Sequence, residues 1–184
     1  MTGVQTCALP ICFPVTIRLV HAKKMFAHFD FDGEISEKLV HQLNSFLPPS
    51  IAVKKVFEVK EDFHARFSAK YRTYEYYISL EKNPFSEKFA WQHWRKSLDV
   101  EKMNEACKIL FEYEDFGSFA KVGADNKTNI CKIYHANWEQ NGNELKFTIS
   151  ADRFLRNMVR AIVGTMVEIG SGKLKPADLR NERR

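Results

Sequence analysis

One stretch of the sequence carries side chains that could grip an unpaired nucleotide. Residues 62–76 contain Arg66 and end in the motif Arg72-x-Tyr74-x-Tyr76. Successive side chains of a strand point to opposite faces, so Arg72, Tyr74 and Tyr76 would share one face. Aromatic rings stack on bases, and a guanidinium binds phosphate. The pattern predicts either a nucleotide-binding surface or an amphipathic strand whose tyrosines pack in a core.

The composition is that of a globular protein with a mild basic excess. The 184 residues include 28 Lys or Arg against 23 Asp or Glu, a formal net charge of +5, and 45% are hydrophobic. This excess is compatible with an RNA partner, although many basic proteins bind no nucleic acid. No apolar run reaches the ~20 residues of a membrane span. The apolar start lacks a basic segment and is broken by Pro10 and Pro14, so we expect neither a membrane span nor a signal peptide.

The cysteines predict no metal site. Cys7, Cys12, Cys107 and Cys131 form no C-x-x-C pair, and none lies near a histidine at ligand spacing. We interpret Cys107 and Cys131 as buried free thiols, which suit a reducing compartment. The sequence thus predicts a cytoplasmic protein without a bound metal.

Hydrophobic periodicity and turn signals predict alternating strands and helices. The expected elements are a short strand at 26–30, a helix at 36–46, a strand at 51–59, a long strand or strand pair at 63–80, a helix at 99–113, a hairpin of 130–140 and 144–150, and a helix at 154–169. Asn141-Gly142 is the turn signal of the hairpin. This order predicts an α+β fold with helices on one side of an antiparallel sheet.

Four motifs in a fixed order make the chain resemble the tRNA pseudouridine synthases of the TruA type. The first is the 62–76 stretch. The second, Phe154-Leu-Arg-Asn-Met-Val-Arg160-Ala-Ile-Val-Gly164, is similar to the family's third motif. The third, Glu114-Asp-Phe-Gly-Ser-Phe119, is similar to the family's linker. The fourth, Val20-His21-Ala22 with Phe29-Asp30, is similar to the tail of the family's first motif. The resemblance runs from about His21 to about Leu179. It implies the pseudouridine synthase fold, in which two α/β halves face each other across a basic cleft.

The resemblance also implies a domain organisation. The expected parts are a non-native-looking leader at 1–20, the remainder of the N-terminal α/β half at 21–80, a linker at 81–98, the C-terminal α/β half at 99–180 and a tail at 181–184. The family's first strand and the helix after it would be missing. We therefore expect an incomplete fold, from a reading frame broken upstream of about His21.

The chemistry that the resemblance implies needs no cofactor and no metal. In this family the bond between uracil N1 and ribose C1′ breaks, and the base rotates and rejoins through C5, with an Asp as nucleophile. Tyr74 matches the Tyr that stacks on the target base, and Arg160 matches the Arg that pairs with the Asp. A packed strand tyrosine and a surface helix arginine are the structural alternatives. The implied substrate is tRNA, in its anticodon stem-loop, and the implied assembly is a homodimer.

Further candidates for substrate binding are Arg66, Arg72 and His21. Arg66 would contact an RNA phosphate or brace the cleft, with a structural role as the alternative, and His64 is interpreted as structural. Apolar neighbours of Arg160 in the sequence predict that Arg160 points inward; these neighbours are Met158, Ile162 and Val163.

The nucleophilic Asp itself is absent. The family's first motif reads Gly-Arg-Thr-Asp-x-Gly-Val-His, and alignment on Val20-His21 puts Ile17 at the Asp and Leu19 at the second Gly. An isoleucine has no carboxylate with which to attack the substrate. We therefore expect an isomerase by family whose present chain is inactive. The alternative is a non-catalytic RNA-binding fragment or a degenerate paralogue.

Overall fold

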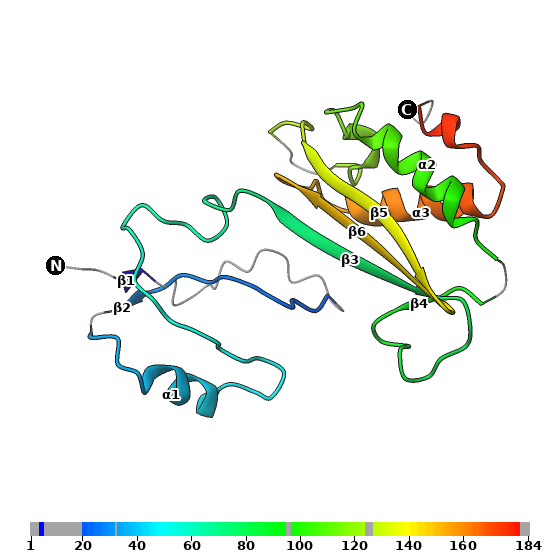
Figure 1. Ribbon diagram of the computed structural model, residues 1–184. Helices are drawn as coiled ribbons and strands as arrows, with labels where there is room; N and C mark the ends of the chain where they lie inside the picture. Colours follow the sequence, from blue (N-terminus) through cyan, green and yellow to red (C-terminus); the bar gives the residue numbers. More distant parts are fainter. Residues whose placement is uncertain (1–3, 6–19, 32, 95–96, 124–126, 181–184) are drawn as a thin grey trace. The chain divides into compact units, whose positions relative to one another are not determined.

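The computed structural model divides into two compact units (Figure 1). It describes residues 4–5, 20–31, 33–94, 97–123 and 127–180. Unit 1 comprises Met1–Ala69 and unit 2 comprises Lys70–Arg184. The boundary between the two units therefore lies within residues 21–80, the expected remainder of the N-terminal half. The limits of that half remain a prediction from the family resemblance.

A four-stranded mixed sheet forms the framework of unit 2. The strands are β3 (Arg72–Ser79), β4 (Trp91–Gln92), β5 (Ile133–Asn141) and β6 (Glu144–Ala151), in the order β4-β3-β6-β5. The β3–β6 and β5–β6 pairs are antiparallel, and the short β4 runs parallel to β3. Gly142 in the β5–β6 turn has φ +57°, a conformation that glycine adopts readily. The predicted hairpin is confirmed.

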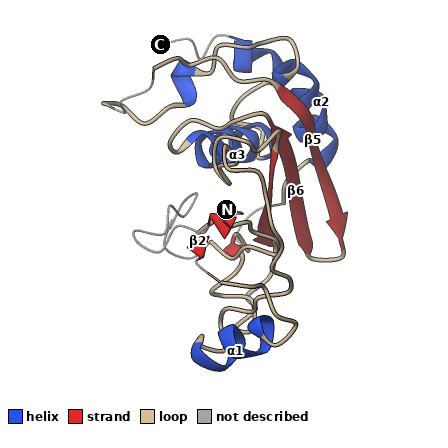
Figure 2. Cartoon of the chain, turned by 90° about the vertical axis from the view of Figure 1, so that its left-hand side faces the viewer, coloured by secondary structure: helices blue, strands red, loops and turns tan. Residues whose placement is uncertain are grey.

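Two helices, α2 (Val100–Leu110) and α3 (Met158–Gly170), cover one face of this sheet, and Figure 2 shows them next to the strands. The covered face is fully buried in its centre, at Ile78, Leu145, Phe147 and Ile149. The residues between these on β6 are only partly buried and polar: Lys146, Thr148 and Ser150. The structure therefore confirms the α+β fold with helices on one side. Two short 3-10 helices complete the unit, η1 (Gly117–Phe119) and η2 (Pro176–Arg180).

Unit 1 has fewer regular elements in its described part. Helix α1 spans Leu39–Phe46, and the two-residue strands β1 (Val4–Gln5) and β2 (Asp30–Phe31) pair antiparallel. The strand predicted at 51–59 is wrong, because that segment forms no strand ladder. Instead, the Asn44 side chain donates to the Val53 carbonyl at 2.9 Å and accepts from the Val53 N–H at 2.8 Å. These two bonds tie the segment to α1.

The long strand predicted for 63–80 begins only at Arg72. A turn precedes it, closed by a 2.8 Å bond from the Ser68 N–H to the His64 carbonyl. The His64 N–H in turn donates to the Ser68 hydroxyl at 3.0 Å. Such local side-chain bonds compete with strand pairing, and alternation of residue types does not reveal them.

No helix among the described residues is long and apolar enough to cross a membrane.

Candidate nucleic-acid interface

Two motifs that are far apart in the sequence meet beside β3 in unit 2. The Arg72 guanidinium donates through Nη1 to the Asp152 backbone carbonyl at 2.9 Å, although the two residues are 80 positions apart. The Tyr74 ring packs edge-on against Phe154, with ring centres 5.2 Å apart and planes at 79°. Pairing of β3 with β6 causes this meeting, because Arg72 lies opposite Ala151 and β6 leads directly into the 152–157 connection.

Arg72, Tyr74 and Tyr76 share one face of β3, as predicted. Their partners on β6 all belong to the buried face: Ala151, Ile149 and Phe147. Burial raises the pKa of Tyr74, and the positive charge of Arg72 opposes this rise only in part. Burial likewise raises the pKa of Tyr76, and here Arg160 opposes the rise. Both tyrosine hydroxyls therefore stay protonated at neutral pH.

Arg160 lies in the first turn of α3 and is exposed. Arg160 is therefore not buried among its apolar neighbours, although Val163, three positions further along the helix, is buried. The positive charge of Arg160 lowers the pKa of Tyr76, whereas the cation that lowers the pKa of Tyr74 is Arg72.

Positive charge gathers where α3 begins. Arg153 and Arg156 precede the helix, and Arg160 lies in its first turn. The N-terminal end of a helix dipole is itself positive, so these groups together favour an anionic ligand such as phosphate. Asp152, whose Oδ1 accepts the backbone N–H groups of Lys132 at 2.8 Å and Arg153 at 2.6 Å, offsets only one of these three positive charges.

The other candidates lie in unit 1 or outside the described residues. His21 and Arg66 are both exposed in unit 1. The Arg66 guanidinium carbon lies 5.4 Å from the centre of the Phe67 ring. Ile17 lies outside the described residues, as does most of the expected 1–20 leader.

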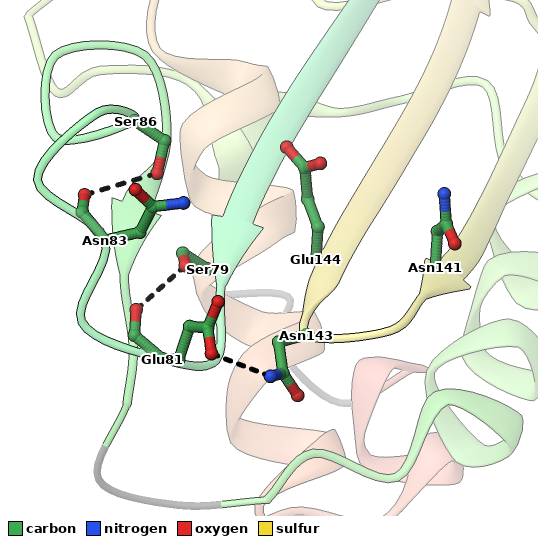
Figure 3. Close-up of a pocket in the computed structure, with 7 residues that line it drawn as sticks. All are labelled: Ser79, Glu81, Asn83, Ser86, Asn141, Asn143 and Glu144. Atoms are coloured by element: carbon green, nitrogen blue, oxygen red, sulfur yellow. Dashed lines mark hydrogen bonds between the residues drawn. The ribbon is translucent and has the colours of Figure 1, made fainter.

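A polar hollow of about 220 Å³ lies at the opposite end of β3 from Arg72 (Figure 3). It is lined by Ser79, Glu81, Asn83, Ser86, Asn141, Asn143 and Glu144. The Glu81 carboxylate accepts the Asn143 amide at 2.8 Å. The negative charges of Glu81 and Glu144 disfavour an RNA phosphate here. We therefore do not count the hollow as part of the arginine-rich surface. Within the described part of the chain, no group of His, Cys, Asp and Glu is arranged to hold a metal ion.

Two residues of this interface, Phe154 and Asp152, were not predicted from the sequence as functional residues. Phe154 opens the third-motif segment, so an aromatic residue three positions after the end of a strand could have signalled a contact with Tyr74. Asp152 accepts the Arg72 hydrogen bond through its backbone carbonyl. Every residue has such a carbonyl, so the residue type at position 152 does not predict this contact.

Comparisons with known proteins give one consistent result. The tRNA pseudouridine synthase family profile matches residues 106–182. The chain is 54% identical over 164 residues to tRNA pseudouridine synthase A of Bacteroides fragilis, covering 88% of this chain and 65% of that relative. Identity to the enzyme of the same name from Parabacteroides distasonis is 51%, with the same coverage. A Clostridium botulinum relative of that name is 44% identical over 165 residues, and 67% of its length is covered. The chain thus spans about two thirds of the length of these relatives.

Proposed function

The chain belongs to the tRNA pseudouridine synthase family, and on this premise we propose that it carries a tRNA-binding surface of an enzyme that isomerises uridine to pseudouridine. The observation that carries the proposal is the contact between Tyr74 and Phe154 beside Arg72. This contact joins two motifs of the family on one surface. Aromatic rings next to guanidinium groups are suited to an unpaired base and its phosphates.

The proposed reaction is an isomerisation of one nucleotide. The bond from uracil N1 to ribose C1′ breaks and a bond from C5 to C1′ forms, while C5 loses a proton and N1 gains one. The target base must leave the helical stack, which costs a few kcal/mol. Tyr74 offsets part of this cost by stacking on the base. Because its pKa is raised, Tyr74 acts in the unbound chain as a neutral phenol.

We propose that Arg160 is the cation that would hold the family's catalytic Asp ionised and oriented. Ile17 stands at the aligned position of that Asp. This chain would therefore bind tRNA without isomerising it, and the second candidate function is that of a non-catalytic RNA-binding fragment. Arg66, Arg72 and His21 are proposed to contact the tRNA.

The setting of this function is also proposed. We infer a cytoplasmic location, supported by the unpaired thiols of Cys107 and Cys131, which are buried. We infer a homodimer for the intact family member from the family resemblance. The proposed region of the substrate is the anticodon stem-loop.

Salt-dependent binding tests the proposed surface. We expect tRNA affinity to fall steeply with salt, because cations that neutralise phosphates release counterions. Arg160→Gln should weaken binding and reduce the salt slope by about one. Lys108→Gln, an exposed cation in α2, is the matched control and should leave the slope unchanged. No binding at low salt would refute the proposal.

Competition with RNA hairpins tests the proposed region of the substrate. An isolated anticodon stem-loop should displace labelled tRNA at lower concentration than a D stem-loop of equal length. Equal competition by the two hairpins would show that the chain recognises charge alone, and it would contradict the anticodon assignment.

A further inference from the structure

A turn in unit 1, His64–Ser68, presents Arg66 at the end of a stack of rings. The ring centre of His28 lies 4.4 Å from that of His64, and the His64 centre lies 4.4 Å from that of Phe67. The Arg66 guanidinium carbon follows, 5.4 Å from the Phe67 ring centre. The stack thus begins at two half-buried imidazoles and ends at Phe67, whose side chain is 75% exposed, beside a cation.

Both imidazoles also hold the backbone of this turn. His28 Nδ1 accepts the Ala65 N–H at 3.2 Å. His64 Nδ1 accepts the N–H groups of Arg66 at 3.1 Å and Phe67 at 3.3 Å. Three consecutive backbone donors therefore end on ring nitrogens. A ring nitrogen accepts a hydrogen bond only when it carries no proton, so the turn requires both Nδ1 atoms to be unprotonated.

Protonation of either ring would oppose this arrangement. An imidazolium has an N–H at both ring nitrogens, so its Nδ1–H would face the backbone donors that it now accepts. The new charge would also lie against the neighbouring imidazole. The segments that carry the two rings hold Asp30 and Asp62 as well. Both are exposed, so water weakens their attraction for an imidazolium.

We propose that neutral His28 and His64 are positioning residues, which hold the turn that presents Arg66 to tRNA and release it when they gain a proton. This inference rests on the proposed contact between Arg66 and tRNA. It predicts an unusual direction of pH dependence, because a histidine that gains a proton ordinarily strengthens attraction to RNA phosphates. Here acidification weakens binding.

Amide resonances of the unbound chain test the positioning role without RNA. When the pH is lowered from about 7.5 to about 5.5, the resonances of Ala65, Arg66 and Phe67 should shift together. They should stay fixed in the double variant His28→Asn/His64→Asn, because an Asn side-chain oxygen accepts hydrogen bonds but does not protonate. His41→Asn, in α1, is the matched control and should leave the shifts intact. Shifts that persist in the double variant, or that are absent from the wild type, would overturn the inference.

Binding measurements over the same pH range separate this inference from the proposed function. Wild-type affinity for tRNA should fall about threefold or more on acidification, whereas that of the double Asn variant should not fall. An equal rise in both proteins would overturn the inference. Arg66→Ala should weaken binding at about pH 7.5. If Arg66→Ala bound tRNA as tightly as the wild type, the proposed contact between Arg66 and tRNA would be refuted. The amide resonances would still decide whether the histidines hold the turn.

Discussion

At the scale of single residues, Tyr74 is the side chain on which the proposed binding depends most. Its ring is half-buried and packs edge-on against Phe154. Burial raises its pKa, so its hydroxyl is protonated at neutral pH. A neutral phenol can stack and form hydrogen bonds but is a poor base. The ring, more than the hydroxyl, should therefore carry the affinity for an unpaired base.

Substitution of Tyr74 tests this assignment. Tyr74→Phe should keep tRNA affinity within about twofold, and Tyr74→Ala should lower it by about tenfold to a hundredfold, because stacking on a base contributes about 1–3 kcal/mol. Fluorescence anisotropy with labelled tRNA measures both, and circular dichroism checks that the variants are folded. Tyr134→Ala, on β5 and 51% exposed, is the control that should bind normally. If Tyr74→Ala bound tRNA with full affinity, the Tyr74 ring would not be part of the interface.

The buried thiols give a prediction about alkaline pH. Burial raises the pKa of Cys107 from 9.0 to about 12 and that of Cys131 from 9.0 to about 11. Above about pH 9 a thiol ionises in the unfolded chain but stays neutral in the folded one. The free energy of unfolding should therefore fall as pH rises from 9 toward these values. Urea denaturation of Cys107→Ala should show a shallower fall than the wild type, and equal slopes would contradict this burial effect.

At the scale of elements, the start of α3 has an unusual backbone. Asn157, which directly precedes the helix, has φ +70°, and it is the one non-glycine residue with positive φ among those that the structure describes. Its side chain makes no capping hydrogen bond. Asn tolerates this conformation better than most residues, and β-branched residues tolerate it poorly. The conformation at Asn157 therefore sets how the chain enters the turn that carries Arg160.

Changes at Asn157 should reveal this constraint. Asn157→Gly should keep or raise the free energy of unfolding by up to about 1 kcal/mol, whereas Asn157→Val should lower it by about 1–2 kcal/mol. Urea denaturation measures both. Asn137→Gly, inside β5, is the control and should destabilise by about 0.5–1 kcal/mol, because glycine weakens a strand. Equal losses in both glycine variants would mean that the backbone at Asn157 is ordinary.

Local patterns explain which elements the sequence could predict. The β5–β6 hairpin, α2 and α3 follow from a turn dipeptide and from apolar periodicity, which are properties of neighbouring residues. The turn at 64–68 was missed because it depends on side-chain acceptors, including His28, 37 positions away from Ala65. The exposure of Arg160 was not predicted, because its apolar neighbours in the sequence favoured an inward position. The contact of Arg72 with a backbone carbonyl required the strand register.

At the scale of the whole molecule, the chain combines the proposed base-binding residues with a first motif that, by our proposal, lacks its Asp. Ile17→Asp would restore the missing carboxylate at the aligned position. We expect this change alone to leave the chain inactive, because Val15 and Leu19 also replace the Arg and Gly of that motif. Tritium release from tRNA labelled at uridine C5 measures this, and release by the Ile17→Asp variant would show that Ile17 is the sole defect.

The central claim is that this chain holds tRNA but does not isomerise it. The most direct measurement is single-turnover tritium release, with the wild-type chain in excess over tRNA labelled at uridine C5 and with complex formation verified in the same sample. We expect the tRNA to be bound and tritium release to equal that of the protein-free blank. Release above the blank from the wild-type complex would contradict it, because the chain would then possess a nucleophile that the aligned Ile17 cannot provide.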